Sequence, residues 1–326
     1  MSHPFDLLTP DCVLDAVERL GLCTDARIMA LNSFENRVYQ VGIEDQAPLI
    51  AKFYRPGRWS AAAIREEHAF AFELAEQEIP VVAPIQRDGE SLFEHAGFYF
   101  ALFPRRGGHA PEPGDLEQLY RFGQLLGRLH AVGRRRPFVQ RETLNVAGFG
   151  HAALAAVAAS GFLPERLHAA YRARAGELLA RLDALFARVD YTPIRLHGDC
   201  HPGNLLLRDG QFHIVDLDDC RMGPAVQDLW MLLSGNREER TRQLGELLEG
   251  YQEFNDFAPR ELALIEGLRS LRLLHYSAWL AQRWDDPAFP ASFPWFTAAG
   301  YWDEQINLLD EQLAALEQPP LQLQPW

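Results

Sequence analysis

The chain has few cysteines and no long apolar run. Its four cysteines in 326 residues form no CxxC pair or other metal-binding pattern, and reduced thiols in a cytoplasmic protein explain them most simply. No stretch approaches the length that crosses a bilayer, and residues 1–10 lack the basic and apolar regions of a signal peptide. We therefore expect a cytoplasmic protein that has no membrane partner.

Positive charge is also scarce. The chain carries 31 Lys and Arg against 45 Asp and Glu, which gives a formal net charge of −14. This surplus disfavours nonspecific binding to nucleic acids or anionic membranes. A solvated loop explains the one strong basic cluster, residues 134–136. Any phosphate site in this chain must be made locally cationic by Lys, Arg and a bound cation.

The hydrophobic pattern changes character along the chain. Strand-like stretches and two helices alternate first, and helical patterns dominate after a Gly-rich joint. Strands are expected at 37–43, 49–54, 91–94 and 98–103, and helices at 11–20, 59–77, 116–130, 154–158, 166–189, 237–254 and 262–284. The pattern predicts an α+β, bilobal, protein-kinase-like fold. A small β-rich N-lobe would span 1–104 and a larger, mostly helical C-lobe 105–326, with an irregular Pro-rich tail at 318–326.

One motif carries most of the chemical information. Residues 196–204 read L-H-G-D-C-H-P-G-N, and residues 214–219 read I-V-D-L-D-D. In protein kinases an Asp at this spacing handles the acceptor hydroxyl, while an Asn and a second Asp hold Mg²⁺ against the ATP phosphates. We therefore predict Asp199 and Asp216 as catalytic residues, and Asn204 and Asp216 as ligands of Mg²⁺. An isolated Asp and Asn would more often be turn residues, but this ordered set favours phosphoryl transfer.

Neighbouring residues are expected to support this motif. His197 is predicted to hydrogen-bond the loop rather than act as a base, and Asp228 to accept backbone N–H groups from it. Cys200 and Cys220 flank the motif, and packing is favoured over a redox role for both, which leaves oxidant sensing open.

The nucleotide side depends on a lysine. Lys52 ends the string I-A-K on a predicted strand, where kinases pair a Lys with the α- and β-phosphates and with a helix Glu. A lone strand Lys would more often face solvent. Glu66 and Glu67 are both possible partners. Glu67 is favoured because Phe70 and Leu74 then fall on its inward side.

The phosphate loop and the adenine site are less well marked. The first 104 residues contain no G-x-G-x-x-G, and Ser33 is the candidate ATP contact, with a turn cap as the equal alternative. Adenine is expected to bond backbone groups near 102–105, which places Phe103 and Arg105 in the ATP site. Pro104 has no N–H to offer there.

These motifs resemble those of the aminoglycoside phosphotransferase and choline kinase superfamily, and longer segments resemble its bacterial stress response kinase family. The longer segments are residues 32–40, 51–59, 97–104, 223–233 and 319–325. The resemblance implies a monomeric, cytoplasmic serine/threonine protein kinase that uses ATP and Mg²⁺ and acts in envelope and oxidative stress. It also implies that Asp199 is the base, that Asn204 and Asp216 bind Mg²⁺, and that Ser33 touches ATP.

The departures from ordinary protein kinases keep alternatives open. Gly198 replaces the usual Arg, D-L-D replaces D-F-G, and nine residues separate Asp218 from Asp228, too few for a long activation segment. Control by activation-loop phosphorylation is therefore not expected. The leading hypothesis is a kinase of Ser and Thr hydroxyls, its own included. A small-molecule kinase for an aminoglycoside, amino alcohol or sugar is the rival, and a pseudokinase is disfavoured by the intact site residues.

Overall fold

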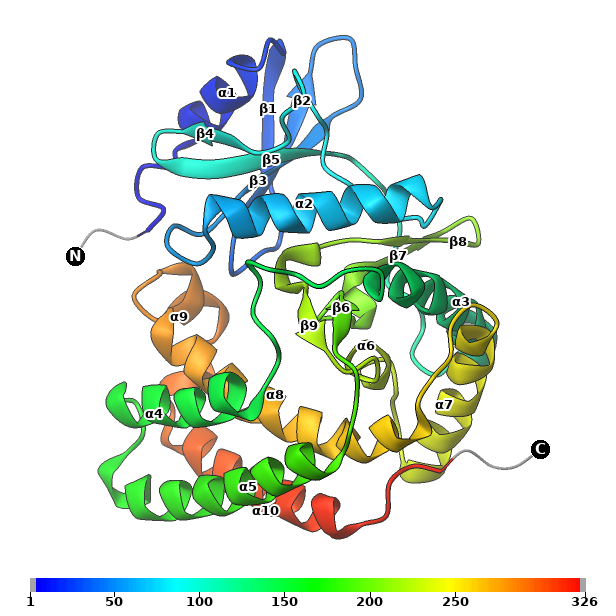
Figure 1. The fold of residues 1–326 in the computed structure, drawn as a ribbon. Helices are drawn as coiled ribbons and strands as arrows, with labels where there is room; N and C mark the ends of the chain where they lie inside the picture. Colours follow the sequence, from blue (N-terminus) through cyan, green and yellow to red (C-terminus); the bar gives the residue numbers. More distant parts are fainter. Residues whose placement is uncertain (1–3, 323–326) are drawn as a thin grey trace. The chain divides into compact units, whose positions relative to one another are not determined.

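The computed structural model describes residues 4–322 and divides them into two compact units (Figure 1). The sheet unit contains residues 4–112, Phe138–Arg141 and Asp199–Cys220. The helical unit contains Pro113–Pro137, Glu142–Gly198 and residues 221–322. The motif at 199–220 therefore packs with the N-terminal sheet. The division into lobes at residue 104 stays a prediction.

The sheet unit is built on a five-stranded antiparallel sheet with the order β1-β2-β3-β5-β4. The strands are β1 (Thr24–Ala30), β2 (Arg37–Ile43), β3 (Leu49–Phe53), β4 (Phe93–His95) and β5 (Phe98–Pro104). β3 is the central strand, so a residue at its middle is flanked by paired backbone on both sides. This strand carries Lys52.

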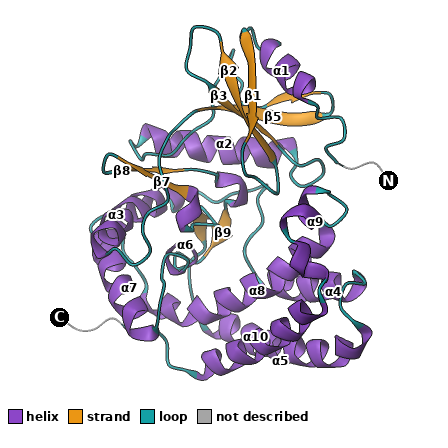
Figure 2. Cartoon of the chain, turned by 180° about the vertical axis from the view of Figure 1, so that it is seen from behind, coloured by secondary structure: helices purple, strands orange, loops and turns teal. Residues whose placement is uncertain are grey.

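A helix covers each face of this sheet (Figure 2). α1 (Pro10–Glu18) begins at Thr9, whose side chain accepts the N–H of Cys12, and α2 (Ala61–Glu76) begins at Ser60, whose side chain accepts the N–H of Ala63. On β5, Phe100 packs with α1, whereas its neighbour Ala101 packs with α2. Because side chains alternate along a strand, α2 lies on the face that bears Lys52.

A small hairpin joins the sheet unit from much later in the sequence. Its strands β7 (Leu205–Arg208) and β8 (Gln211–Ile214) pair with Leu205 opposite Ile214. Ile214 exchanges backbone hydrogen bonds with the segment after α2, donating to Pro80 at 2.8 Å and accepting from Val82 at 2.9 Å. These bonds hold Ile214, and through it the paired residue Leu205, in the same unit as Lys52.

The helical unit holds most of the remaining chain. Its helices are α3 (Leu116–Gly133), α4 (Ala152–Ala159), α5 (His168–Arg188), α6 (Gln227–Trp230), α7 (Arg237–Gln252), α8 (Ile265–Gln282), α9 (Ala288–Ser292) and α10 (Ala299–Glu317). Two strands, β6 (Ile194–Leu196) and β9 (Arg221–Gly223), pair with each other and come before and after residues 199–220 in the chain. The predicted mixture of a sheet-rich N-terminal part and a helical C-terminal part is confirmed.

α3 and α7 approach closely because glycines line their contact. A Cβ on Gly123 would overlap the carbonyl oxygen of Leu247, and one on Gly250 would overlap that of Tyr120. Glycine is therefore required where the two backbones meet. The close packing sets Tyr251 of α7 directly against His130 of α3, with ring centroids 5.5 Å apart.

The sequence did not predict the strands β1, β6, β7 and β9 or the helices α6, α9 and α10. The tail has no regular element over residues 318–322, and its last residues, 323–326, lie outside the described part of the chain. Within residues 4–322, no helix is both long and apolar enough to cross a membrane.

Candidate active site

The β7–β8 hairpin brings Asp199, Asn204 and Asp216 together. Val215 donates its backbone N–H to the carbonyl of Asn204 at 3.0 Å, so Asn204 lies across the hairpin from the residue that precedes Asp216. The Asn204 side-chain N–H₂ donates to the carbonyl of Asp199 at 3.0 Å. Because its nitrogen is used in this way, Asn204 presents its amide oxygen as the remaining group. These bonds bring the backbones of the three residues close together, and their joint role in catalysis stays a prediction.

Asp216 has an unusual backbone conformation. Its φ of 60° and ψ of 70° place it in the left-handed region, which few residues with a Cβ adopt. The chain leaves β8 at this point, so the carboxylate stands at the end of a buried strand while remaining 52% exposed. One carboxylate oxygen lies 2.8 Å from the Lys52 ammonium.

Lys52 is nearly buried and is surrounded by carboxylates. Its Nζ lies 2.8 Å from Asp216 Oδ1, 3.4 Å from Asp218 Oδ1 and 3.7 Å from Glu67 Oε1. Burial alone would lower the pKa of Lys52, but Asp216, Asp218 and Glu67 outweigh it and raise the pKa well above its usual value. Lys52 is therefore a fixed positive charge.

The two adjacent glutamates of α2 have different partners. Glu67 is the one beside Lys52, and its second oxygen accepts from Arg141 Nη2 at 2.7 Å. Glu66 accepts the backbone N–H groups of Val139, Gln140 and Arg141 at 2.6, 2.8 and 3.1 Å. Burial raises the pKa of Glu67, whereas Lys52 and Arg141 oppose that rise.

Asp218 forms a buried ion pair that the sequence did not indicate. Arg58 Nη1 donates to its carboxylate, and Arg58 Nη2 donates to Asp219 at 2.8 Å. Burial by itself raises the pKa of Asp218, but Arg58, Lys52 and Arg141 outweigh burial and hold that pKa well below the usual range of a carboxyl. Asp218 is therefore ionised, and its negative charge lies 3.4 Å from the Lys52 ammonium.

The predicted phosphate loop is a closed turn. The Ser33 hydroxyl donates to the carbonyl of Asn36 at 3.1 Å, which is the turn role given as its alternative. Asn36 in turn accepts the N–H of Arg55 at 3.0 Å, and Arg55 Nε pairs with Glu35 at 3.1 Å. The residues that follow β3 thus hold this loop in place. Contact between Ser33 and ATP stays a prediction.

The predicted adenine residues lie on and beyond β5. Phe103 pairs with Ile50 in register, and Ala101 pairs with Lys52, so the Phe103 side chain shares the sheet face of Lys52. Arg105 follows β5 and is exposed. Their contacts with the nucleotide stay predictions.

His201 was not singled out from the sequence. Its Nδ1 accepts the backbone N–H of Gly203 at 3.0 Å and caps the short turn Pro202–Asn204. A neutral His201 must then carry its proton on Nε2, which lies 3.4 Å from Asp199 Oδ2. The signal that could have found it is the spacing D-x-H, which places both side chains on one tight turn.

In the helical unit, Asp228 holds the two residues that precede Asp199 in the chain. Its carboxylate accepts the backbone N–H of His197 and of Gly198, each at 2.8 Å. It also bonds His130 Nε2 at 3.0 Å, and His130 Nδ1 bonds the Tyr251 hydroxyl at 2.9 Å. Asp228 and His197 both have fully buried side chains, and the structural role predicted for each stays a prediction.

Cys200 and Cys220 are both fully buried, and neither forms a disulfide. Burial places them among packed residues and away from an aqueous oxidant. A redox role for either stays a hypothesis.

The residues present fit a divalent cation that arrives with a nucleotide. The amide oxygen of Asn204 and the second carboxylate oxygen of Asp216 are hard ligands of the type that Mg²⁺ prefers. Among the described residues no group of three or more His, Cys, Asp or Glu could hold a metal by itself. A cation here would therefore need oxygens from phosphate or water, as in phosphoryl transfer.

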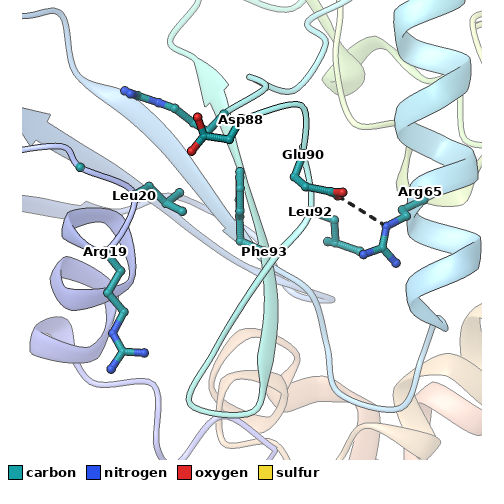
Figure 3. Close-up of a pocket in the computed structure, with 9 residues that line it drawn as sticks. Arg19, Leu20, Arg65, Asp88, Glu90, Leu92 and Phe93 are labelled. Atoms are coloured by element: carbon teal, nitrogen blue, oxygen red, sulfur yellow. Dashed lines mark ion pairs between the residues drawn. The ribbon is translucent and has the colours of Figure 1, made fainter.

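A separate cavity of about 560 Å³ opens elsewhere in the sheet unit (Figure 3). It is lined by Arg19, Leu20, Gly21, Arg65, Arg87, Asp88, Glu90, Leu92 and Phe93. None of these is a predicted site residue. Arg19 and Arg65 lie on opposite sides of it and do not converge, so their charges define no common binding point.

Comparisons with known proteins cover most or nearly all of the chain. Residues 27–265 match the profile of the phosphotransferase enzyme family. Stress response kinase A of Escherichia coli (strain K12) is 46% identical over 324 residues, covering 99% of this chain and 98% of that protein. Serine/threonine protein kinase RdoA of Salmonella typhimurium is 44% identical with the same coverage.

A solved structure gives the likeness in fold. The amicoumacin kinase hAmiN in complex with AMP-PNP, Ca²⁺ and Ami superposes with a TM-score of 0.69 at 18% identity, covering 90% of this chain and 92% of that chain. At this identity the likeness shows the fold alone, and it confirms the predicted kinase-like architecture.

Proposed function

The chain belongs to the phosphotransferase enzyme family, and from this premise we propose that it is an ATP-dependent serine/threonine protein kinase of the bacterial stress response. One observation carries the catalytic part of the proposal. The hairpin sets Asn204 beside Asp216 and joins it to Asp199, while Lys52 lies 2.8 Å from Asp216. Full-length identity of 44–46% to relatives named as stress response and serine/threonine kinases supports the biological part.

The side chains divide the reaction between them. Lys52, a fixed cation, neutralises charge on the ATP phosphates and holds them in line. Asn204 and Asp216 would hold Mg²⁺, which supplies the remaining charge neutralisation. The Asp199 carboxylate accepts the proton of a Ser or Thr hydroxyl as that oxygen bonds to the γ-phosphorus and the bond to ADP breaks. His201 Nε2, 3.4 Å from Asp199 Oδ2, would help to orient that carboxylate.

Protein is the acceptor that we propose, and a small hydroxyl compound is the alternative. Relatives with nearly the same length and close to half of the residues identical include one named as a serine/threonine protein kinase. The nine residues between Asp218 and Asp228 leave little chain for a peptide platform, which favours a small acceptor. The choice between them needs a direct assay.

The assay follows the transfer of label from [γ-³²P]ATP. The protein is incubated with Mg²⁺ and a generic basic protein, and separately with a panel of aminoglycosides, amino alcohols and sugars. We expect label on Ser and Thr of the protein substrate and on the kinase itself. The Asp199→Ala variant is the control and should transfer label roughly a hundredfold or more slowly. Label that appears only on metabolites would refute the protein-kinase proposal and establish the small-molecule kinase.

The remaining parts of the proposal are a cytoplasmic location and a monomeric state. The absence of a disulfide among Cys12, Cys23, Cys200 and Cys220 supports a reducing compartment. A monomer predicts the mass of one chain, 37.0 kDa, in size-exclusion chromatography with light scattering. A mass near twice that value would contradict it.

A further inference from the structure

The segment Phe138–Arg141, which we call the clip, fastens helix α2. It lies between α3 and α4 in chain order, yet it packs in the sheet unit. The ring of Phe138 meets Phe70 of α2 edge to face, with centroids 5.4 Å apart. Glu66 of α2 accepts three successive backbone N–H groups of the clip. α2 and the clip are thus joined by both apolar and polar contacts.

Arg141 ends the clip and is enclosed completely, with 0% of its side chain exposed. Its Nε donates to the carbonyl of Ala63 at 3.0 Å, and its Nη1 donates to the carbonyl of Asp218. The guanidinium also lies 4.3 Å from the centre of the Trp59 ring. One side chain therefore ties α2 to the loop that follows Asp216.

The shortest ionic contact of Arg141 is with Glu67, at 2.7 Å, whereas Lys52 lies 3.7 Å from Glu67. The planar guanidinium holds one oxygen of Glu67 in a fixed direction, and this leaves the other oxygen facing Lys52. Without Arg141, a buried Glu67 would keep a single cation that Asp216 and Asp218 also attract. The position of Lys52 would then no longer be determined by α2.

We propose that Arg141 is a positioning residue of the nucleotide site, which acts through Glu67 to place the Lys52 ammonium for the ATP phosphates. The inference rests on the proposed function. Arg141 itself touches no nucleotide because its side chain is fully enclosed.

A double-mutant cycle on ATP binding tests this. The dissociation constant of a fluorescent ATP analogue with Mg²⁺ is measured for wild type, Arg141→Met, Glu67→Gln and the double variant. Each single change should weaken binding roughly tenfold, and the double variant should bind no more weakly than the weaker single variant. Arg136→Met is the matched control, an exposed arginine outside the clip, and should bind as wild type does.

Additive losses in the cycle would overturn the proposal, because Arg141 would then act without Glu67. Unchanged nucleotide binding with only a lower melting temperature would also overturn it, since that result indicates a structural role alone. If Arg141→Met does not fold, Arg141→Lys takes its place in the same cycle. Failure of the proposed function is seen separately, as a wild-type protein that binds the analogue but transfers no label to Ser or Thr.

Discussion

Replacing Asp218 with asparagine removes one buried negative charge and leaves the side-chain shape almost unchanged. The Asp218 side chain is 4% exposed. Its carboxylate forms an ion pair with Arg58, and Lys52 Nζ lies 3.4 Å from its Oδ1. The asparagine variant would leave both cations in the interior with a neutral amide in place of their carboxylate. We expect a large loss of stability, because Lys52 and Arg58 each lose a buried carboxylate partner.

The magnitude follows from the geometry. At an effective dielectric constant of about 20, unit charges 3.4 Å apart attract by about 5 kcal/mol. Relaxation and solvation of the two cations in the variant offset part of this lost attraction. Breaking a buried pair typically costs about 3–5 kcal/mol. We expect the Asp218→Asn variant to lose about that much free energy of unfolding at neutral pH.

The effect should depend on pH with a defined sign. The folded-state pKa of Asp218 is held well below its value of about 3.9 in an unfolded chain. Its stabilisation is therefore complete above that unfolded value and is lost as the pH falls through the depressed folded value. The difference between wild type and variant should stay constant from about pH 5 to pH 8 and shrink below about pH 4.

Urea unfolding at several pH values measures this difference, with Asp219→Asn as the matched control. Asp219 pairs with the same Arg58 but is 31% exposed, so its loss should stay below about 1 kcal/mol. The reasoning fails if both variants lose the same amount, or if the Asp218→Asn deficit grows as the pH falls.

Three further changes probe the chemistry. Asp199→Ala should lower kcat roughly a hundredfold or more with little change in ATP affinity, measured by steady-state kinetics, because a positioned base contributes that order of rate. Asp216→Ala should instead weaken binding of Mg·ATP in calorimetry, and an unchanged affinity would remove Asp216 from the metal site. Replacing both Cys200 and Cys220 with Ser should leave the response of activity to peroxide unchanged, because both thiols are buried. A variant that resists peroxide better than wild type would establish a redox role.

The sequence predicted the parts of the site that short-range geometry determines. Asn204 and Asp216 lie close together because a short hairpin joins them, with Leu205 opposite Ile214, and the string I-A-K marks Lys52 on a predicted strand. Arg58 and Arg141 were missed, since they reach Asp218 and Glu67 across 160 and 74 positions of the chain. No local pattern marks such contacts.

Local features explain why two of the elements, β1 and α10, were not predicted. β1 breaks its own alternation, with a register shift between Thr24 and Ile28 and a positive φ of 61° at Ala26. α10 starts without a side-chain cap, so no Ser, Thr, Asp or Asn marks its first turn.

The glycine contact between α3 and α7 makes the backbone of His197 and Gly198 sensitive to distant changes. A methyl group at Gly250 would push the backbone of Tyr120 away and carry the adjacent Tyr251 with it. The Tyr251 hydroxyl, His130 and Asp228 form an unbroken relay of hydrogen bonds to the backbone of His197 and Gly198. A substitution at this contact would thus displace the backbone of His197 and Gly198, although it removes none of the predicted site side chains.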